Sequence, residues 1–126
     1  MSAYHGIVIH GLRNGRELGF PTANIHLHDE VEIENGCYAV RVNVSDKTFS
    51  GMLYVGTRPT LNLHEISYEI NIFDFHGDIY GMEIAFSIEG KIRDEQHFDN
   101  VKTLIEQLKH DKEDALAIIA RKTNSN

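Results

Sequence analysis

The chain has 126 residues, of which 41% are hydrophobic and 25% charged, and its formal net charge is −7. This length suits one domain with one core, and the composition excludes a wholly disordered protein. An acidic chain without a basic cluster is not expected to bind nucleic acid or an anionic membrane, and neither a membrane-spanning run nor a secretory signal is visible. The single cysteine, Cys37, excludes an internal disulfide and a cysteine-based zinc site, and it predicts a cytoplasmic protein.

Alternation of apolar and polar residues predicts β-strands through most of the chain. The strands are expected at 6–10, 37–44, 49–55, 66–73 and 82–89. Turns are expected at 45–47 and 76–78. The strands are too closely spaced for βαβ crossovers, so about six short strands followed by helices predict a small β-barrel or sandwich.

The spacing of apolar residues becomes helical in the last part of the chain, over 98–122. Asp99 or Asn100 can cap a helix there. The first apolar stripe consists of Val101, Leu104, Ile105 and Leu108. We expect a break at His110 and Asp111, and then a second helix that begins at Asp111 or Asp114 and runs through Ala115, Leu116 and Ile119.

A glycine-rich segment near the N-terminus is a candidate anion-binding loop. Gly11, Gly15 and Gly19 are four residues apart, so backbone N–H groups can approach a phosphate there, and Arg13 and Arg16 add positive charge. The segment matches neither of the common phosphate-binding glycine motifs. On composition alone, an ordinary loop with two exposed arginines is the simpler explanation.

Thr22 and Asn24 follow this loop and are candidate metal ligands. Pro21 favours an extended backbone before it, and in an extended segment both side chains would point the same way. Hydroxyl and amide oxygens suit Mg²⁺, which takes few protein ligands beside phosphate oxygens and water. From these residues alone, a turn with bonds between side chain and backbone is the alternative.

Glu69 is the acidic residue best placed to act as a general base. It lies in the middle of a predicted strand, on the polar face between Ser67 and Asn71, so a rigid element would hold it. A carboxylate there can accept the proton of an alcohol that attacks phosphorus. The alternative is a solvated, outward-facing glutamate.

Three segments together resemble the riboflavin kinase (flavokinase) family. They are Gly-Arg-Glu-Leu-Gly-Phe-Pro-Thr-Ala-Asn at 15–24, Gly-Thr-Arg-Pro-Thr at 56–60, and 68–81 with Tyr-Glu-Ile-Asn-Ile-Phe-Asp-Phe and Asp-Ile-Tyr-Gly. The resemblance continues through 92–98 and covers the chain from about Tyr4 to about Leu116. It implies a single kinase domain over 1–126, with a six-stranded antiparallel Greek-key β-barrel at about 4–95 and C-terminal helices at about 98–122.

The resemblance also implies roles for individual residues. Glu69 matches the proposed catalytic base of the family, and Thr22 and Asn24 match positions that contact Mg²⁺ and the nucleotide phosphate. The flap loop over ATP would contain Gly11, Arg16 and Gly19. The flavin side of the site would contain Arg93 and Glu95.

The implied reaction converts riboflavin and ATP to FMN and ADP, with Mg²⁺ as the metal. In many bacteria this domain is the C-terminal half of a bifunctional FAD synthetase, but adenylyltransferase motifs are absent from this chain. We therefore expect a kinase domain, standing alone or excised from a longer protein, that makes FMN and not FAD. The alternative is a flavin- or nucleotide-binding barrel without catalysis, because fold alone does not decide function. Convergence of Thr22, Asn24 and Glu69 on one cleft would favour the kinase.

Overall fold

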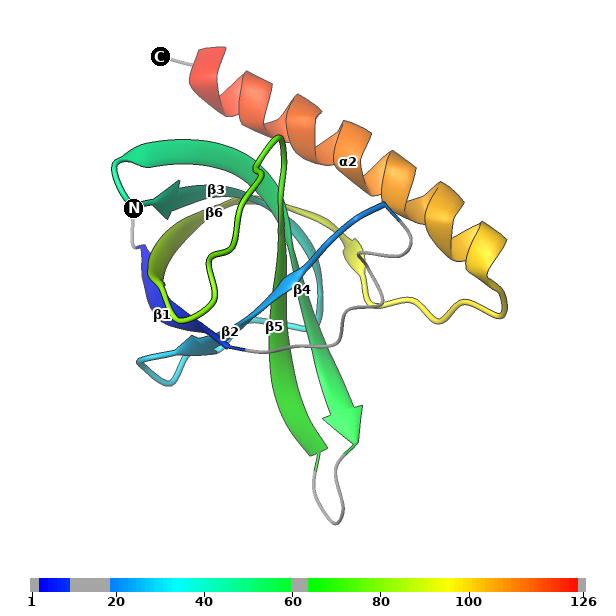
Figure 1. Cartoon of the computed structure of the whole chain (residues 1–126). Helices are drawn as coiled ribbons and strands as arrows, with labels where there is room; N and C mark the ends of the chain where they lie inside the picture. Colours follow the sequence, from blue (N-terminus) through cyan, green and yellow to red (C-terminus); the bar gives the residue numbers. More distant parts are fainter. Residues whose placement is uncertain (1–2, 10–18, 60–63, 125–126) are drawn as a thin grey trace.

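The computed structural model describes residues 3–9, 19–59 and 64–124, and its centre is a closed β-barrel with a long helix beside it (Figure 1). The elements are β1 (Tyr4–Ile9), β2 (Ala23–Leu27), β3 (Gly36–Val44), β4 (Lys47–Pro59), β5 (His64–Ile72), β6 (Glu83–Asp94) and α2 (Val101–Asn124). The barrel order is β1-β2-β5-β4-β3-β6, and all neighbouring strands are antiparallel. The predicted six-stranded antiparallel barrel is therefore confirmed.

The barrel interior is built from the apolar side of the alternating strands. Its fully buried side chains include Val40, Val42, Leu53, Ile70 and Phe86. These residues come from β3, β4, β5 and β6, so the alternation recognised in the sequence places one apolar face of each strand inside the barrel.

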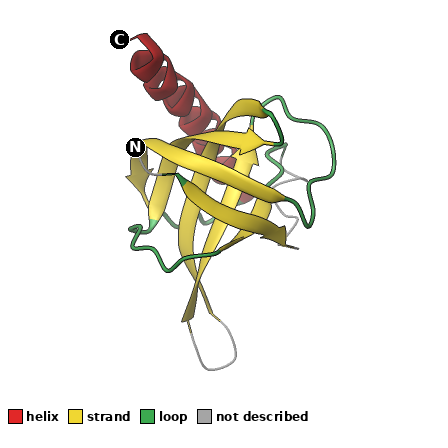
Figure 2. Cartoon of the chain, turned by 90° about the vertical axis from the view of Figure 1, so that its left-hand side faces the viewer, coloured by secondary structure: helices red, strands yellow, loops and turns green. Residues whose placement is uncertain are grey.

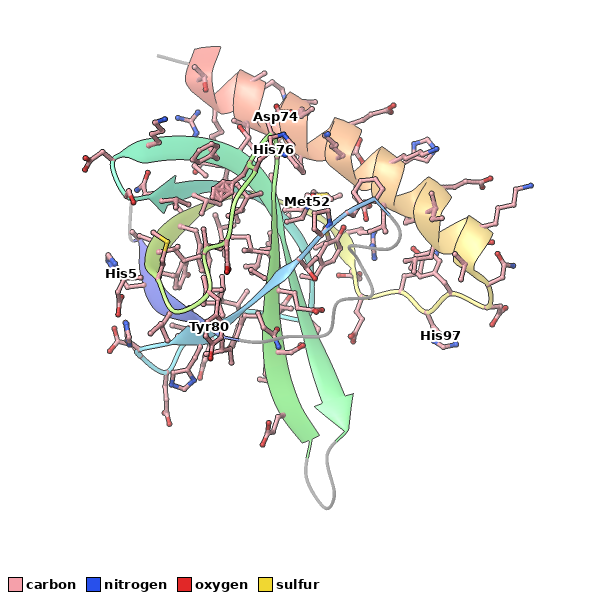
Figure 3. The ribbon with its side chains drawn as sticks, in the orientation of Figure 1. His5, Met52, Asp74, His76, Tyr80 and His97 are labelled. Carbon is pink, nitrogen blue, oxygen red and sulfur yellow. The ribbon has the colours of Figure 1, made fainter. Side chains whose placement is uncertain are left out.

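Helix α2 covers part of the outer wall and forms a second core there. It packs against β3, β4 and β6 and lies outside the barrel (Figure 2). Cys37 and Ala39, which lie on the outer face of β3, are fully buried together with Met52 under Ala115 and Ile119 of the helix. Figure 3 labels Met52, which lies beside α2. Cys37 is thus a buried core residue.

The expected break at His110 and Asp111 is wrong, because α2 runs without interruption from Val101 to Asn124. Asp111 is fully buried and forms an ion pair with Arg93 of β6. This pair stabilises the packing of α2 on the barrel, and the helix continues through Asp111. The buried stripe follows Leu108, Asp111, Ala115 and Ile119, whereas Val101 is 58% exposed. Asn100 is the cap, since its Oδ1 accepts a 2.8 Å hydrogen bond from the backbone N–H of Thr103.

Strand β2 is the element that the alternation pattern did not locate. It begins directly after Pro21 and Thr22 and pairs with both β1 and β5. Strands β4 and β6 are also longer than expected, and β6 follows β3 through two register shifts that let it curve around the barrel. The turn expected at 45–47 is confirmed, with Ser45 at a φ of 55°.

Within the described ranges, no helix is both long and apolar enough to span a membrane.

Candidate active site

Asn24 of β2 lies directly opposite Glu69 of β5 in the antiparallel ladder. Directly paired residues place their side chains on the same face of the sheet, with Cβ atoms about 5 Å apart. Thr22 lies two residues before Asn24, just outside the strand, and is partly buried. The ladder therefore brings together Asn24 and Glu69, two of the residues singled out in the sequence, with Thr22 adjacent in the chain.

The side chain of Asn24 carries a buried oxygen without a hydrogen-bond partner. The residue is 7% exposed, and its Oδ1 has no partner among the described residues. A buried amide oxygen left unbonded costs about 1–3 kcal/mol, so such atoms call for an explanation. A metal ion or a ligand donor at this oxygen would supply one.

Asn71 holds the segment that carries Thr22. Its Nδ2 donates a 2.7 Å hydrogen bond to the carbonyl oxygen of Pro21, and the residue is 5% exposed. Sequence reasoning treated Asn71 only as a polar neighbour of Glu69. The available signal was its position two residues after Glu69, which places both side chains on one face of β5.

The row that contains Asn24 and Glu69 continues around the barrel to Arg93. Glu69 pairs with Tyr54, Tyr54 with Cys37, and Cys37 with Arg93. At about 4.8 Å between neighbouring strands, Arg93 lies roughly 14 Å from Glu69 along the sheet. Arg93 is therefore on the same outer wall as the candidate base, but three strands away.

The guanidinium of Arg93 faces helix α2. Its Nε and one terminal nitrogen donate 2.8 and 2.7 Å hydrogen bonds to the two carboxylate oxygens of Asp111. Its central carbon lies 5.9 Å from the ring centre of Tyr54 and 5.7 Å from that of Phe98. The charge of Arg93 is thus neutralised by Asp111, and its flat faces lie near aromatic rings.

Glu95 lies against the segment that begins at Gly56 and is linked to it through Asn35. Its Oε1 accepts a 3.2 Å hydrogen bond from Asn35, which also donates a 3.1 Å bond to Thr57. The other carboxylate oxygen lies over Gly56, where an added Cβ would come within 2.8 Å of it. A side chain at this position would displace the Glu95 carboxylate, which lies at the end of a flexible, exposed side chain.

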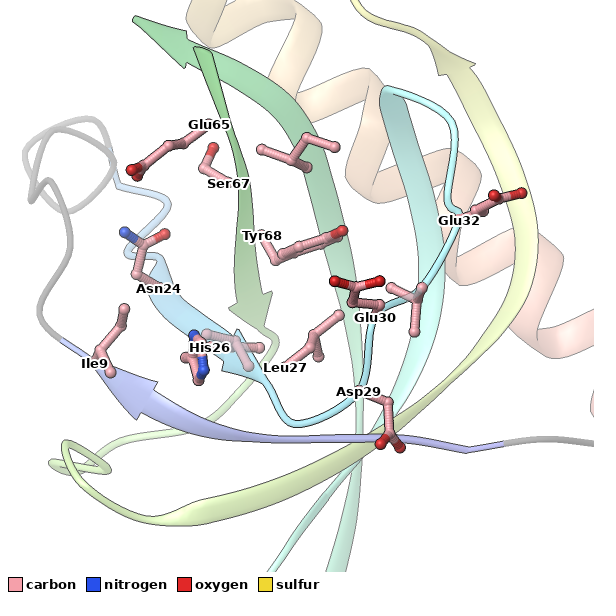
Figure 4. Close-up of a pocket in the computed structure, with 13 residues that line it drawn as sticks. Ile9, Asn24, His26, Leu27, Asp29, Glu30, Glu32, Glu65, Ser67 and Tyr68 are labelled. Carbon is pink, nitrogen blue, oxygen red and sulfur yellow. The ribbon is translucent and has the colours of Figure 1, made fainter. Parts of the chain in front are cut away.

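A cavity of about 620 Å³ opens beside Asn24 between β2 and β5 (Figure 4). Of the candidate residues in the described part of the chain, only Asn24 lines it. Its lining includes Ile9, Ile66 and Tyr68, and four acidic residues: Asp29, Glu30, Glu32 and Glu65. Carboxylates repel a polyphosphate, so this cavity is a poor place for the phosphates of a nucleotide.

The remaining candidates belong to the glycine-rich loop. Gly11 and Arg16 lie outside the described residues. Gly19 is exposed and has a φ of 84°, a backbone conformation that glycine adopts readily and other residues rarely do.

Comparison with known proteins identifies the family. The model of the flavokinase (riboflavin kinase) family matches residues 2–119, so the chain belongs to this family. A bifunctional riboflavin kinase/FMN adenylyltransferase of Bacillus subtilis (strain 168) is 38% identical over 115 residues, covering 88% of this chain and 36% of that protein. The RNA-binding riboflavin kinase RibR of the same organism is 41% identical over 114 residues, covering 88% of this chain and 48% of that protein.

A solved structure from Streptococcus pneumoniae, described as a macrolide-efflux protein, has the same fold. It superposes with a TM-score of 0.82 at 39% identity, covering 88% of this chain and 37% of the other. The chain therefore spans between about one third and one half of the length of these relatives.

Proposed function

We propose that this member of the riboflavin kinase family transfers the γ-phosphate of ATP to the ribityl 5′-hydroxyl of riboflavin, giving FMN and ADP. Family membership supplies the reaction class, since riboflavin kinases use ATP and a divalent metal. The observation that carries the proposal is the direct pairing of Asn24 with Glu69. The side-chain oxygen of Asn24 is buried there and has no hydrogen-bond partner among the described residues.

Thr22 and Asn24 would hold the metal, and we propose Mg²⁺. The unbonded Oδ1 of Asn24 fits this group, because neutral oxygen ligands are what Mg²⁺ prefers. When bound between these side chains and the phosphates, the ion would offset charge on the transferring group. Gly11, Arg16 and Gly19 would lie in the loop over ATP.

Glu69 would accept the proton of the 5′-hydroxyl as that oxygen attacks phosphorus. Pairing of β5 with β2 on one side and with β4 on the other fixes the backbone of Glu69 and the direction in which its side chain leaves the sheet. A positioned base of this kind typically contributes about 10²- to 10⁴-fold to rate.

Arg93 and Glu95 would shape the flavin side. Arg93 is held by its part-buried bond to Asp111, and the exposed Glu95 is held by its bond to Asn35. These bonds support a role in which both residues are positioned before the substrate binds. Preorganisation of this kind lowers the cost of ordering the site on binding.

Relatives such as the 38% identical protein of Bacillus subtilis are named as bifunctional riboflavin kinase/FMN adenylyltransferases, and we propose that this chain corresponds to the kinase part of such an enzyme. A covalently linked adenylyltransferase domain in the native protein would then convert FMN to FAD. A cytoplasmic location remains our expectation from the single cysteine.

The test is incubation of the chain with riboflavin, ATP and Mg²⁺, followed by chromatography of the flavins. FMN should form in step with ADP, and no FAD should appear after further ATP is added. Riboflavin binding without any FMN would instead support the non-catalytic module. FAD formation by this chain would contradict the assignment to the kinase part.

A further inference from the structure

Asn71 makes a buried hydrogen bond to the backbone immediately before Thr22. The 2.7 Å distance from its Nδ2 to the Pro21 carbonyl oxygen is short for a neutral N–H···O bond, and the side chain is almost fully buried. The bond is part-buried, and it satisfies the buried side-chain amide of Asn71. Breaking it would leave that amide without this acceptor, which is costly for a buried donor.

The bond stands where the β-ladder stops. Main-chain pairing of β2 with β5 comprises Ala23 with Ile70 and Asn24 with Glu69. The same register would place Thr22 opposite Asn71, but β2 begins at Ala23. Pro21 has no N–H and cannot donate to a neighbouring strand. The side chain of Asn71 thus substitutes for a ladder bond just before the chain enters β2.

We propose that Asn71 is a positioning residue for the metal–nucleotide site. By holding the Pro21 carbonyl, it sets the direction of Thr22 relative to Asn24 and Glu69. This inference rests on the proposed role of Thr22 and Asn24 as metal ligands. Strand β5 then carries both the candidate base and, two residues later, the anchor of the segment that supplies the ligands.

The size of the expected effect follows from the sensitivity of phosphoryl transfer to position. A displacement of about 1 Å in a positioned group can cost about 10²-fold in rate. Asn71→Asp keeps the side-chain size but removes the donor and places a carboxylate beside the carbonyl oxygen. We expect the half-saturating concentration of Mg-ATP to rise at least about tenfold, while riboflavin affinity, measured by fluorescence quenching, changes less than about twofold.

The matched control is Asn43→Asp on β3. Asn43 is exposed, and its Oδ1 accepts a 2.8 Å hydrogen bond from Thr48, which a carboxylate can also accept. The substitution adds the same charge away from the site, so the Mg-ATP requirement should stay as in the wild type.

Two further variants keep the inference testable if Asn71→Asp folds poorly. Asn71→Ala removes the donor without adding charge and should raise the Mg-ATP requirement. Asn71→His retains an N–H donor close to the position of Nδ2 and should restore most of the affinity. A lower melting temperature with unchanged Mg-ATP kinetics per folded molecule in the Asp and Ala variants would show a purely structural role and overturn the inference.

Thr22→Ala in the same assay separates this inference from the proposed function. A raised Mg-ATP requirement in Thr22→Ala but not in the Asn71 variants would overturn the role of Asn71 alone. An unchanged requirement in Thr22→Ala would remove the metal role of Thr22 and, with it, the role of Asn71.

Discussion

Asp111, in the middle of α2, accepts hydrogen bonds from Arg93 of β6 on both carboxylate oxygens, at 2.8 and 2.7 Å. Gln107, one helical turn earlier, donates a further 2.9 Å bond to the same carboxylate. Asp111 is fully buried and the Arg93 side chain is 16% exposed, so this ion pair lies between the helix and the barrel wall. It joins α2 to the strand end that leads to Glu95.

Removal of the Asp111 carboxylate should strongly destabilise the fold. Asp111→Ala leaves the Arg93 guanidinium without its counter-charge in a largely buried place, which typically costs about 3–5 kcal/mol of unfolding free energy. Asp114→Ala, at an exposed position on the same helix, is the control and should change stability by less than about 0.5 kcal/mol. Urea unfolding followed by circular dichroism measures both, and a small loss in Asp111→Ala would show that the pair does not hold the helix.

The double variant Arg93→Met, Asp111→Leu tests what the pair contributes beyond stability. Apolar residues of similar size often replace a buried ion pair at little cost, so the double variant should be more stable than Asp111→Ala. If Arg93 shapes the flavin side, riboflavin affinity should fall in this folded variant. Affinity equal to that of the wild type would remove Arg93 from the flavin side.

Glu69→Gln should separate the proton-accepting role from binding. The amide keeps the size of the side chain and the pairing of β5, but it cannot take a proton from the 5′-hydroxyl. We expect kcat to fall by at least about 10²-fold, with riboflavin affinity changed far less. Steady-state FMN formation and fluorescence quenching on one preparation measure the two quantities. Glu65→Gln, exposed on the same strand, is the control for loss of a carboxylate.

Near wild-type kcat in Glu69→Gln would exclude Glu69 as the base. Loss of riboflavin binding and turnover together would instead indicate that Glu69 positions the ligand.

The barrel could be predicted from the sequence because its strands obey a local rule. The alternation in 37–44 reports burial on one face of a strand, and Val40 and Val42 are indeed fully buried. Alternation within a strand does not indicate whether a helix covers the other face of that strand. Cys37 and Ala39 lie on the other face of the same strand, and only the packing of α2 across it buries them.

The two residues that sequence reasoning misjudged both depend on distant partners. A charged Asp111 beside His110 is typical of a helix end. It can lie inside a helix when a cation faces it, and here that cation is Arg93, 18 residues away in the chain. Asn71 bonds to a carbonyl oxygen 50 residues earlier, so nothing in its local sequence indicates the contact. The packing of α2 on the barrel wall brings Arg93 to Asp111, and the pairing of β2 with β5 brings Pro21 to Asn71. Neither contact can be predicted from local periodicity.

Thr22→Ala and Asn24→Ala should weaken the Mg-nucleotide complex while the fold persists. Truncation of Asn24 removes an oxygen that bonds no described residue, so little protein–protein interaction is lost with it. The half-saturating Mg²⁺ concentration at fixed ATP should rise in each variant, whereas riboflavin affinity should hold. Thr48→Ala, exposed near the β3–β4 turn, is the control. A variant that unfolds more easily but keeps normal activity and Mg²⁺ dependence per folded molecule would show that the substituted residue does not hold the metal.

Burial of Cys37 should make the protein less stable in alkaline solution. Burial raises the pKa of the thiol from its ordinary 9.0 to about 12, and the nearby carboxylate of Asp111 acts in the same direction. Above pH 9 the unfolded chain loses this proton while the folded protein retains it. Since the unfolded state then binds fewer protons, the unfolding free energy falls as pH rises from about 9 toward 12. Below pH 9 the thiol is protonated in both states and contributes no slope.

Cys37→Ala removes this titration and should give a shallower decline of unfolding free energy over the same pH range. Burial also raises the pKa of Tyr54, so part of the alkaline decline should persist in the variant. Denaturant unfolding at pH 8, 9.5 and 10.5 on both proteins measures the difference. In parallel, a thiol reagent should react with the wild-type protein at pH 9.5 only as fast as the chain opens, because Cys37 is fully buried. Parallel pH profiles for the two proteins, or rapid labelling of the folded wild type, would show that the thiol is not held protonated under α2.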